Sequence, residues 1–289
     1  MKLSFRNRKR LTGLYFVGPW AVAALLFLVY PFIFSVILSF SKLKNADFST
    51  MGLIGFANYK KVFISDVKFL PAFYSVVSDT LVNTPMIVIF SLLIAMILNR
   101  NIAGRGVFRS LFFLPVLLGG GLVFEQIVSR NVDGQSMELA MSVLLPEKLQ
   151  SYLGPEITGY INSFFGRITL ILWKSGVQIV ISLSGLQSIS PALYEAARVD
   201  GATEWEMFWK ITLMMMSPII LLNAVYTIVI SLTENNSVVS YITEQAFGTS
   251  PVQFEFSAAM GCVYLLFTLI LVLLVFALLR PFIKRVQQV

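Results

Sequence analysis

Six apolar segments separated by polar connections dominate the pattern of the chain. They cover residues 11–41, 80–99, 110–129, 168–189, 211–232 and 256–279. Apolar runs of roughly 18 or more residues with few charges are long enough to cross a bilayer as helices. The pattern therefore predicts an all-α, polytopic membrane protein with six transmembrane helices, which form one transmembrane domain over residues 1–289.

The composition supports a membrane protein and removes several kinds of chemistry. Hydrophobic residues make up 57% of the chain, charged residues only 13%, and the mean hydropathy is +0.79. A soluble domain has about 25% charged residues. The chain has no histidine and a single cysteine, Cys262. We therefore expect no disulfide, no histidine-based catalysis, no metal site and no resident cofactor.

The basic residues indicate the orientation of the spans. With the N-terminus in the cytoplasm, inner segments carry thirteen Lys and Arg residues and outer loops carry eight. The positive-inside rule thus places both termini in the cytoplasm and residues 42–79, 130–167 and 233–255 outside. The net charge of +7 is explained by these flanking positions, so we expect no nucleic-acid partner.

The first apolar run follows a basic N-terminus, as in a signal peptide. A signal peptide has an apolar core of about 7–15 residues before a small-residue cleavage site. Residues 11–41 form a longer run without such a site. We predict an uncleaved first span.

A charged stretch between the fourth and fifth apolar segments, residues 190–210, predicts two short helices joined by a turn. Ser190 and Pro191 form a helix start, since serine can cap free N–H groups and proline suits the first helical turn. Gly201 is a stop, because glycine adopts the left-handed conformation that ends helices. Thr203 and Glu206 have the spacing of a capping box, which opens the second helix.

This stretch has two interpretations on spacing alone. Ala196 and Ala197 would let another chain approach closely, and Glu195 and Asp200 offer acceptors to a basic partner. The alternative is a connecting loop whose charges keep it in water. On the predicted topology the stretch faces the cytoplasm in either case.

A longer sequence around this stretch resembles the EAA motif of permease subunits in bacterial ABC importers. The family pattern is E-A-A, three residues, G, nine residues, I, one residue and L, usually followed by P. In "YEAARVDGATEWEMFWKITL" the residues Glu195, Gly201, Ile211 and Leu213 stand at those spacings. Position 214 is Met where the family usually has proline, which puts the start of the fifth span in doubt, and Pro218 offers a bend four residues later. "GPWAVAALLFLVYPFIFSVILSFS" and "GRGVFRSLFFLPVLLGG" resemble the carbohydrate-uptake branch, typified by the first permease of maltose and glycerol-phosphate importers.

The resemblance implies a type I ABC importer permease fold in the bacterial cytoplasmic membrane. It implies half of a translocation pathway for a carbohydrate, with an oligosaccharide favoured. Its implied partners are a second EAA-type permease, two cytoplasmic ATPase subunits, an extracytoplasmic solute-binding protein and membrane lipid. In such proteins the EAA loop docks into the ATPase. The docking residues implied for this chain are Glu195, Ala196, Ala197, Asp200 and Gly201.

A separate ATPase agrees with the sequence itself. The chain has no glycine-rich phosphate loop ending in Gly-Lys, so ATP and Mg²⁺ are expected on the partner chain. We expect a transport subunit with no catalytic residues.

Polar residues within the spans are candidates for a substrate pathway. These residues are Trp173, Lys174, Gln178, Asn223 and Tyr226. Amide and aromatic side chains suit sugar hydroxyls and sugar rings. The alternatives are that Lys174 extends to the membrane surface and that Asn223 and Tyr226 hydrogen-bond between helices. Glu125, in the third apolar segment, is expected at the outer interface.

The residues also bear on two other function classes. An intramembrane serine protease of the Ser–His type lacks its histidine, and the six segments hold no paired aspartates for an aspartyl type. A stand-alone secondary transporter or channel for a small polar solute is the alternative function. Such proteins often show internal repeats or several intramembrane carboxylates. The basic residues of the first outer loop fit either an acidic sugar or the docking of a binding protein.

Overall fold

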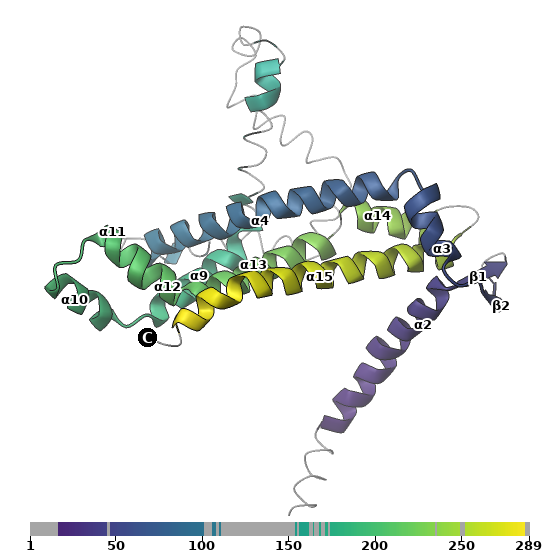
Figure 1. Cartoon of the computed structure of the whole chain (residues 1–289), viewed down its shortest axis with the longest axis horizontal. Coiled ribbons are helices and arrows are strands. Elements are labelled where there is room, and N and C mark those ends of the chain that lie inside the picture. Colours follow the sequence, from purple (N-terminus) through teal and green to yellow (C-terminus); the bar gives the residue numbers. More distant parts are fainter. Residues whose placement is uncertain are drawn as a thin grey trace, which may run out of the picture. The chain divides into compact units, whose positions relative to one another are not determined.

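The computed structural model describes residues 17–44, 47–100, 106–107, 110, 154, 156–161, 164, 168, 171–172, 174–234, 236–248 and 252–286. These residues are mostly helical, as Figure 1 shows. The α-helices are α2 (Tyr30–Ser39), α3 (Ala57–Lys60), α4 (Phe69–Asn99), α9 (Gly176–Ser188), α10 (Pro191–Val199), α11 (Glu204–Met207), α12 (Leu213–Met215), α13 (Ser217–Thr233), α14 (Ser237–Thr243) and α15 (Phe254–Val286). Wider π-helical turns cover Leu25–Val29, Lys61–Ser65, Phe208–Thr212 and Glu244–Gly248, and the strands are β1 (Ser41–Lys44) and β2 (Asp47–Leu53).

Four helical stretches of the described residues are long and apolar enough to cross a membrane. They are Val17–Ser39, Phe69–Asn99, Ser217–Gly248 and Phe254–Pro281. They confirm the first, second, fifth and sixth predicted segments as span-length helices. Helix α9 occupies the last part of the fourth predicted segment, and α9 and α10 together would add a fifth crossing, although the chain bends by 60° between them. The third segment, including Glu125, lies outside the described residues apart from Ser110, so the count of six stays a prediction.

The helix α4 begins well before the sequence predicted. Residues 69–79, which the sequence placed in the first outer loop, form the first turns of α4, so the helix that carries the second span is longer than predicted. Asp66 opens the helix: its Oδ1 accepts hydrogen bonds from the backbone N–H of Lys68 at 3.0 Å and of Phe69 at 2.6 Å.

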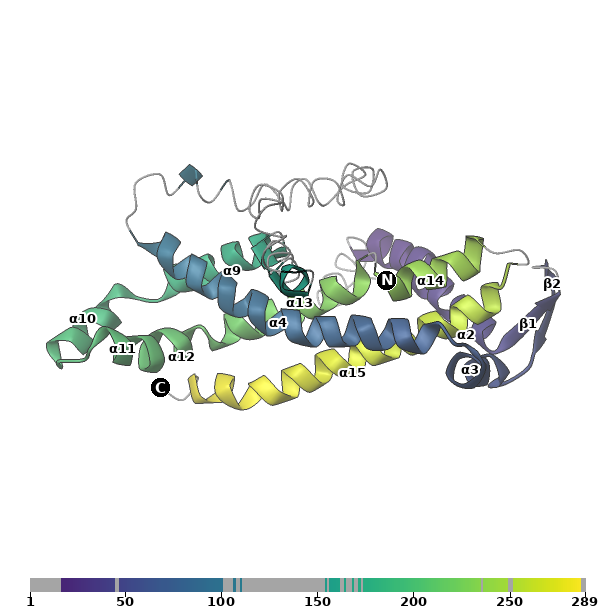
Figure 2. The same ribbon diagram turned by 90° about the horizontal axis from the view of Figure 1, so that it is seen from above.

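The described chain separates into two compact units. Unit 1 comprises Met1–Val77 and Leu232–Leu271, and unit 2 comprises Ser78–Ser231 and Val272–Val289. In unit 1, the end of α2 is followed by the antiparallel pair β1–β2, in which Ser41 pairs with Leu53 and Lys44 with Asp47. The hydrophobic pattern had not predicted this hairpin. Figure 2 shows β1, β2 and α3 gathered at the end of α2.

Two predicted outer loops of unit 1 contact each other directly. Lys61 Nζ donates to Gln253 Oε1 at 2.6 Å, and Tyr241 Oη donates to Asp66 Oδ2 at 2.7 Å. The Lys61 ammonium also lies 4.0 Å from the ring centroid of Phe256. Residues from 42–79 and from 233–255 therefore occupy one region, as they would if both loops lie on the same side of the membrane.

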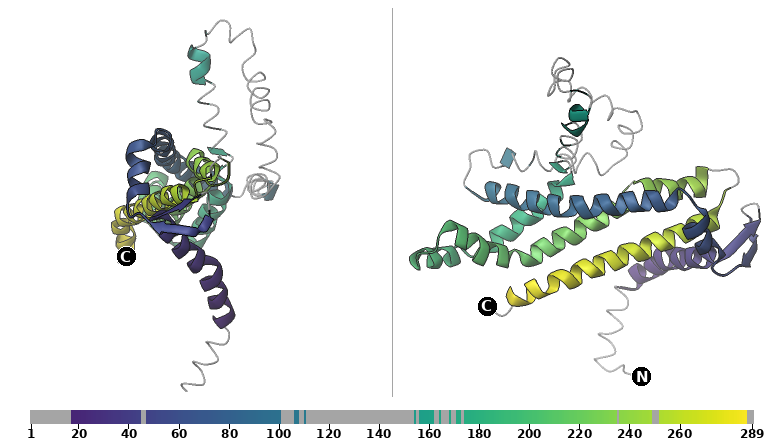
Figure 3. Two further views of the ribbon diagram at one scale, coloured as in Figure 1. Left: turned by 90° about the vertical axis from the view of Figure 1, so that its right-hand side faces the viewer. Right: turned by 45° about the horizontal axis from the view of Figure 1, so that its top comes forward.

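Unit 2 has an apolar core in which the last part of α4 packs on α9 and on the start of α13. Its buried members are Leu92, Ala95, Leu98, Ile179, Leu183, Leu186, Ile189 and Met216. Burying such side chains stabilises a fold by about 1.5–3 kcal/mol each in water, whereas inside a bilayer close packing carries more of the stabilisation. The core fixes the two helices, α9 and α13, that flank the charged stretch. In the right-hand view of Figure 3, the green helices α10 and α11 lie beyond the ends of α9 and α13 that they connect.

Candidate functional site

The candidate site is the connection between α9 and α13, which we call the 190–212 loop. Its first helix, α10, begins as predicted, with Ser190 at the N-cap position in an extended conformation and Pro191 in the first turn. The predicted capping bond is absent, because the Ser190 side chain accepts no hydrogen bond from α10. Ser190 contributes its backbone carbonyl, which accepts from the N–H of Leu193 at 3.1 Å.

The turn after α10 is a Schellman motif centred on Gly201. Gly201 has φ +80°, the left-handed conformation that the sequence predicted. Its N–H donates to the Arg198 carbonyl at 3.1 Å, and the N–H of Ala202 donates to the Ala197 carbonyl at 2.9 Å. These two bonds satisfy carbonyls that the end of a helix otherwise leaves free. The turn is therefore a fixed structure rather than a loose connection.

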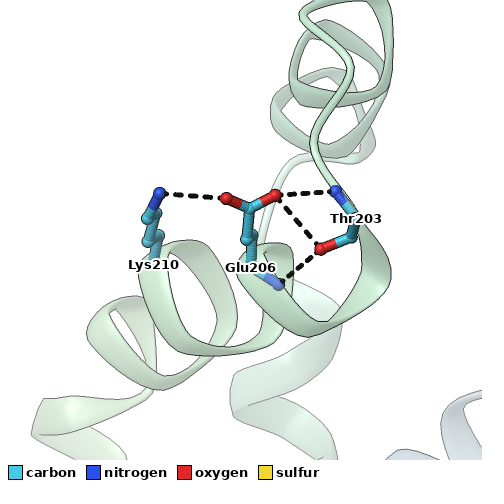
Figure 4. A network of polar contacts seen from close by, with 3 residues as sticks. All are labelled: Thr203, Glu206 and Lys210. Atoms are coloured by element: carbon cyan, nitrogen blue, oxygen red, sulfur yellow. Dashed lines mark hydrogen bonds and ion pairs between the residues drawn. The ribbon is translucent and has the colours of Figure 1, made fainter.

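The second helix opens with the predicted capping box, shown in Figure 4. Thr203 Oγ1 accepts from the N–H of Glu206 at 3.3 Å, and Glu206 Oε2 accepts from the N–H of Thr203 at 3.0 Å. Lys210 Nζ lies 3.4 Å from Glu206 Oε1. The backbone hydrogen bond from Thr203 is the main cause that lowers the pKa of Glu206 below its ordinary 4.5. The capping box is therefore fully formed above that ordinary pKa and is lost as the pH falls through the lowered value.

Replacing Thr203 by alanine is expected to loosen the start of α11. Loss of a threonine cap costs about 1 kcal/mol, so the backbone amides of residues 204–207 should exchange with deuterium about fivefold faster. Hydrogen exchange with mass spectrometry measures this in the purified chain. Thr203→Ser keeps the acceptor oxygen and should exchange like the wild type. Equal rates in both variants and the wild type would show that the capping box does not hold the helix.

The outward surface of the loop is exposed. Helix α10 has no buried residue, and Glu195, Ala196, Asp200 and Gly201 are exposed while Ala197 is half-buried. Within the described part of the chain the ion pairs of the loop are Arg198–Glu204 and Lys210–Glu206. Neither Glu195 nor Asp200 takes part in them. Large apolar side chains are exposed beside these carboxylates, since Leu193 is 43% exposed and Val199 87%.

The two ends of the loop are joined to each other at its base, where Tyr194 also packs against the apolar core of unit 2. Tyr194 Oη and Thr212 Oγ1 lie 2.9 Å apart in a hydrogen bond that joins α10 to the segment entering α13. Met207 is buried at the second helix. The loop thus combines a rigid frame with an exposed surface, the arrangement expected of a docking element.

The segment after the loop bears on the unusual Met214. Met214 is 36% exposed, and the helix continues past it before it is interrupted at Met216. Pro218, near the start of α13, has no N–H to donate and so cannot continue the ladder there. The interruption predicted near Pro218 is thus present, and residue 214 itself is helical.

The substrate-pathway candidates lie on α9 and α13. Gln178 Nε2 donates to Thr227 Oγ1 at 3.0 Å, and Asn223 Nδ2 donates to Ser182 Oγ at 2.7 Å. All four side chains are at least 98% buried. Asn223 makes interhelical hydrogen bonds, the second of its two interpretations. Ser182 and Thr227 were not singled out in the sequence, although each stands four residues after its polar neighbour on the same helix and so on one face.

Two acceptor atoms of this polar group have no hydrogen-bond partner among the residues that the structure describes. They are Gln178 Oε1 and Asn223 Oδ1, both buried. A buried acceptor without a donor costs free energy, so these atoms favour contact with a donor such as a sugar hydroxyl. Lys174 and Tyr226 are half-buried, which leaves both interpretations of each open. Trp173 lies outside the described residues.

One further residue of the α9–α13 contact was missed in the sequence. Gly185 is buried, and a Cβ atom there would lie 2.7 Å from Ile219 Cγ1 and 3.0 Å from Met216 Sδ. Small residues at helix contacts are a known device of membrane bundles. The signal that could have identified Gly185 in the sequence is a glycine within a predicted span.

Comparison with known proteins gives consistent matches. The family model described as "Binding-protein-dependent transport system inner membrane component" matches residues 57–288. The probable ABC transporter permease protein YesP of Bacillus subtilis is 34% identical over 229 residues, covering 78% of this chain and 72% of that protein. The arabinooligosaccharides transport system permease protein AraP of Bacillus subtilis is 29% identical over 284 residues, covering 90% and 85%.

A solved structure shares the fold. It is a chain of a bacterial alginate ABC transporter in complex with an alginate pentasaccharide-bound periplasmic protein. The TM-score is 0.65 at 20% identity, and the match covers 98% of this chain and 99% of that one.

Proposed function

Because the chain belongs to the family of binding-protein-dependent transport system inner membrane components, we propose that it forms one half of the translocation pathway of an ATP-driven carbohydrate importer. The chain is a transport subunit rather than an enzyme. The relatives whose names state a substrate support carbohydrate as the substrate class, since they include permeases for arabinooligosaccharides and for lactose. An oligosaccharide is the substrate we favour.

The 190–212 loop is the proposed contact with a separate ATPase. Its docking residues are Glu195, Ala196, Ala197, Asp200 and Gly201. The observation that carries this assignment is the exposed position of the Glu195 and Asp200 carboxylates on a loop held by a Schellman turn and a capping box. A basic residue of the ATPase would pair with Glu195, and ATP with Mg²⁺ would be bound on that chain.

The remaining partners follow from the family. We propose a second permease of the same type, two ATPase subunits, an extracytoplasmic solute-binding protein and surrounding lipid. The chain would lie in the bacterial cytoplasmic membrane with both termini inside. The contact of residues 42–79 with 233–255 supports this topology, because it requires both loops on one side.

The proposed substrate pathway includes Lys174, Gln178, Asn223 and Tyr226, with Trp173 as a further candidate. Its support is the pair of unpartnered acceptors on Gln178 and Asn223. These atoms are buried in the present arrangement, so substrate would reach them only when α9 and its surroundings open. Alternating access supplies such a step in an importer.

Purification with the products of neighbouring genes tests the proposed function. We expect a second permease and two ATPase copies to accompany the chain, and an extracytoplasmic binding protein to stimulate ATP hydrolysis. In liposomes the complex should accumulate a carbohydrate only with ATP. Uptake by this chain alone, without ATP, would instead support a stand-alone transporter.

Replacing Glu195 by alanine is expected to weaken ATPase association. A charge-assisted contact contributes about 1.5–3 kcal/mol, so the dissociation constant should rise at least about tenfold. Pull-down with increasing ATPase measures it. Glu204→Ala is the matched control, because Glu204 is an exposed carboxylate of the same loop that already pairs with Arg198. Equal affinity of Glu195→Ala and the wild type would remove Glu195 from the interface.

A further inference from the structure

Five aromatic rings of unit 1 contact one another in series, and we call this series the aromatic track. Its successive centroid separations are 6.4, 5.9, 5.6 and 5.8 Å. The rings come from α2, β2, the start of α15 and the π-helical turn after α14. In order they are Tyr30, Phe34, Phe48, Phe254 and Phe247.

The track is an exposed surface rather than a buried core. Tyr30 is 67% exposed, Phe48 48% and Phe247 76%, and Phe34 and Phe254 are half-buried. The contacts that build it join positions far apart in the chain, since Phe48 stacks on Phe254 with ring planes 24° apart. The rings are therefore held in order by the fold, and a large part of the Tyr30, Phe48 and Phe247 side chains remains exposed beside their ring contacts.

The outer part of the track does not have the surroundings of a lipid-facing surface. Phe48 follows Asp47 and precedes Ser49 and Thr50, and Phe254 stands between Gln253 and Glu255. Asp47 and Ser49 are exposed and hydrogen-bonded to each other. Charged and amide side chains next to exposed rings are unfavourable in hydrocarbon, so this end of the track is a hydrated or interfacial surface.

Aromatic faces combined with polar groups are the chemistry that binds carbohydrates. The C–H faces of a sugar ring pack on an aromatic ring, and its hydroxyls need donors and acceptors nearby. Several rings in series at similar separations offer successive platforms to a linear chain of sugars. A monosaccharide would occupy only one of them. The Lys61 ammonium supplies a hydrogen-bond donor near Phe254, since its Nζ donates to Gln253 and lies over the ring of Phe256.

We propose that the aromatic track of unit 1 is a binding subsite for successive sugar rings of a linear oligosaccharide. The proposal rests on the proposed function, import of a carbohydrate with an oligosaccharide favoured, and adds to it a binding site in unit 1. Binding would involve stacking on Phe48, Phe254 and Phe247, with hydroxyls bonded to the neighbouring polar side chains. It does not involve the polar group of α9 and α13, which lies in unit 2.

The test uses the complete transporter in liposomes with its binding protein. ATP-driven uptake is first measured with a panel of mono- and linear oligosaccharides of one to six sugar units, and the best substrate is kept as the probe. Phe48→Ala and Phe247→Ala are then compared with the wild type. Each lost platform should raise the KM for an oligosaccharide between about twofold and tenfold, with kcat unchanged. The KM of a monosaccharide should change less, because a single sugar ring can bind at a ring that remains.

Two matched variants separate binding from folding. Phe48→Tyr keeps the aromatic face and should keep the KM of the wild type. Phe63→Ala removes another phenylalanine of unit 1, 51% exposed and outside the track, and should have no effect. An unchanged KM in both track variants, or a best substrate that is a monosaccharide, would overturn the proposal while leaving carbohydrate import intact. Loss of complex assembly in the track variants would identify the rings as a protein interface and would also overturn it. No ATP-driven uptake of any sugar by the wild type would instead refute the proposed function.

Discussion

Replacing Gly201 by aspartate is expected to abolish substrate-stimulated ATP hydrolysis while leaving the amount of chain in the membrane unchanged. Two effects combine at this position. Most residues with a Cβ atom cost about 1–2 kcal/mol at φ +80°, and aspartate, which tolerates this conformation better than most, strains the Schellman turn by less than that. Aspartate also adds a second carboxylate next to Asp200 on the surface that we propose contacts the ATPase. The turn lies outside the spans, so insertion and folding of the spans should not depend on it.

Two further substitutions at Gly201 distinguish strain from contact. Apart from its two chain neighbours, a Cβ atom there would meet no atom of the described residues within 4 Å, so neither substitution creates a clash with them. Gly201→Ala adds strain with little bulk. Gly201→Asn adopts the left-handed conformation readily but carries a side chain of aspartate's size. If the surface contacts an ATPase, asparagine should impair ATP hydrolysis more than alanine does. Full activity of the asparagine variant with impaired activity of the alanine variant would mean that only the turn matters and that Gly201 touches no partner.

The 190–212 loop shows how much of a site can be predicted from local sequence. Pro191, the left-handed Gly201 and the Thr203–Glu206 box were all predicted, because each depends on residues within one or two turns. The failure of Ser190 to form its cap illustrates the limit of such rules. A cap requires a particular rotamer as well as a suitable residue. At the start of α10 the backbone carbonyl of Ser190, rather than its side chain, accepts the hydrogen bond from the N–H of Leu193.

Contacts between distant segments could not be predicted in the same way. The apolar pattern identified the spans because burial in a bilayer depends on composition over about 20 residues. It gave no sign of the β1–β2 hairpin, of the bond between Tyr241 and Asp66, or of the stacking of Phe48 on Phe254. These features depend on which segments meet after folding. The same holds for Asn223, whose hydrogen bond to Ser182 across two helices could not be predicted from its residue type.

Replacing Gly185 by leucine is expected to destabilise the contact between α9 and α13 by about 1–3 kcal/mol through overpacking. Even a single Cβ atom would lie 2.7 Å from Ile219 Cγ1, and isoleucine, being branched at Cβ, cannot easily turn away. The apparent melting temperature of the purified complex should fall by several degrees. Size-exclusion chromatography of samples heated to a series of temperatures measures it. Gly261→Ala is the control, because a Cβ atom at this helical glycine would meet nothing within 4 Å.

A rescue experiment makes this prediction specific to one pair of residues. Gly185→Ala alone should lower the melting temperature, and Ile219→Ala removes both atoms that a Cβ atom at position 185 would approach most closely on that residue. The cost of Gly185→Ala should therefore be smaller in the Ile219→Ala background, which a double-mutant cycle measures. Additive costs would contradict the close approach of α9 and α13. A real coupling would mean that the two helices on either side of the 190–212 loop are held together at Gly185. Movement of the loop by an ATPase would then displace both helices together, and with them the polar group of Gln178 and Asn223.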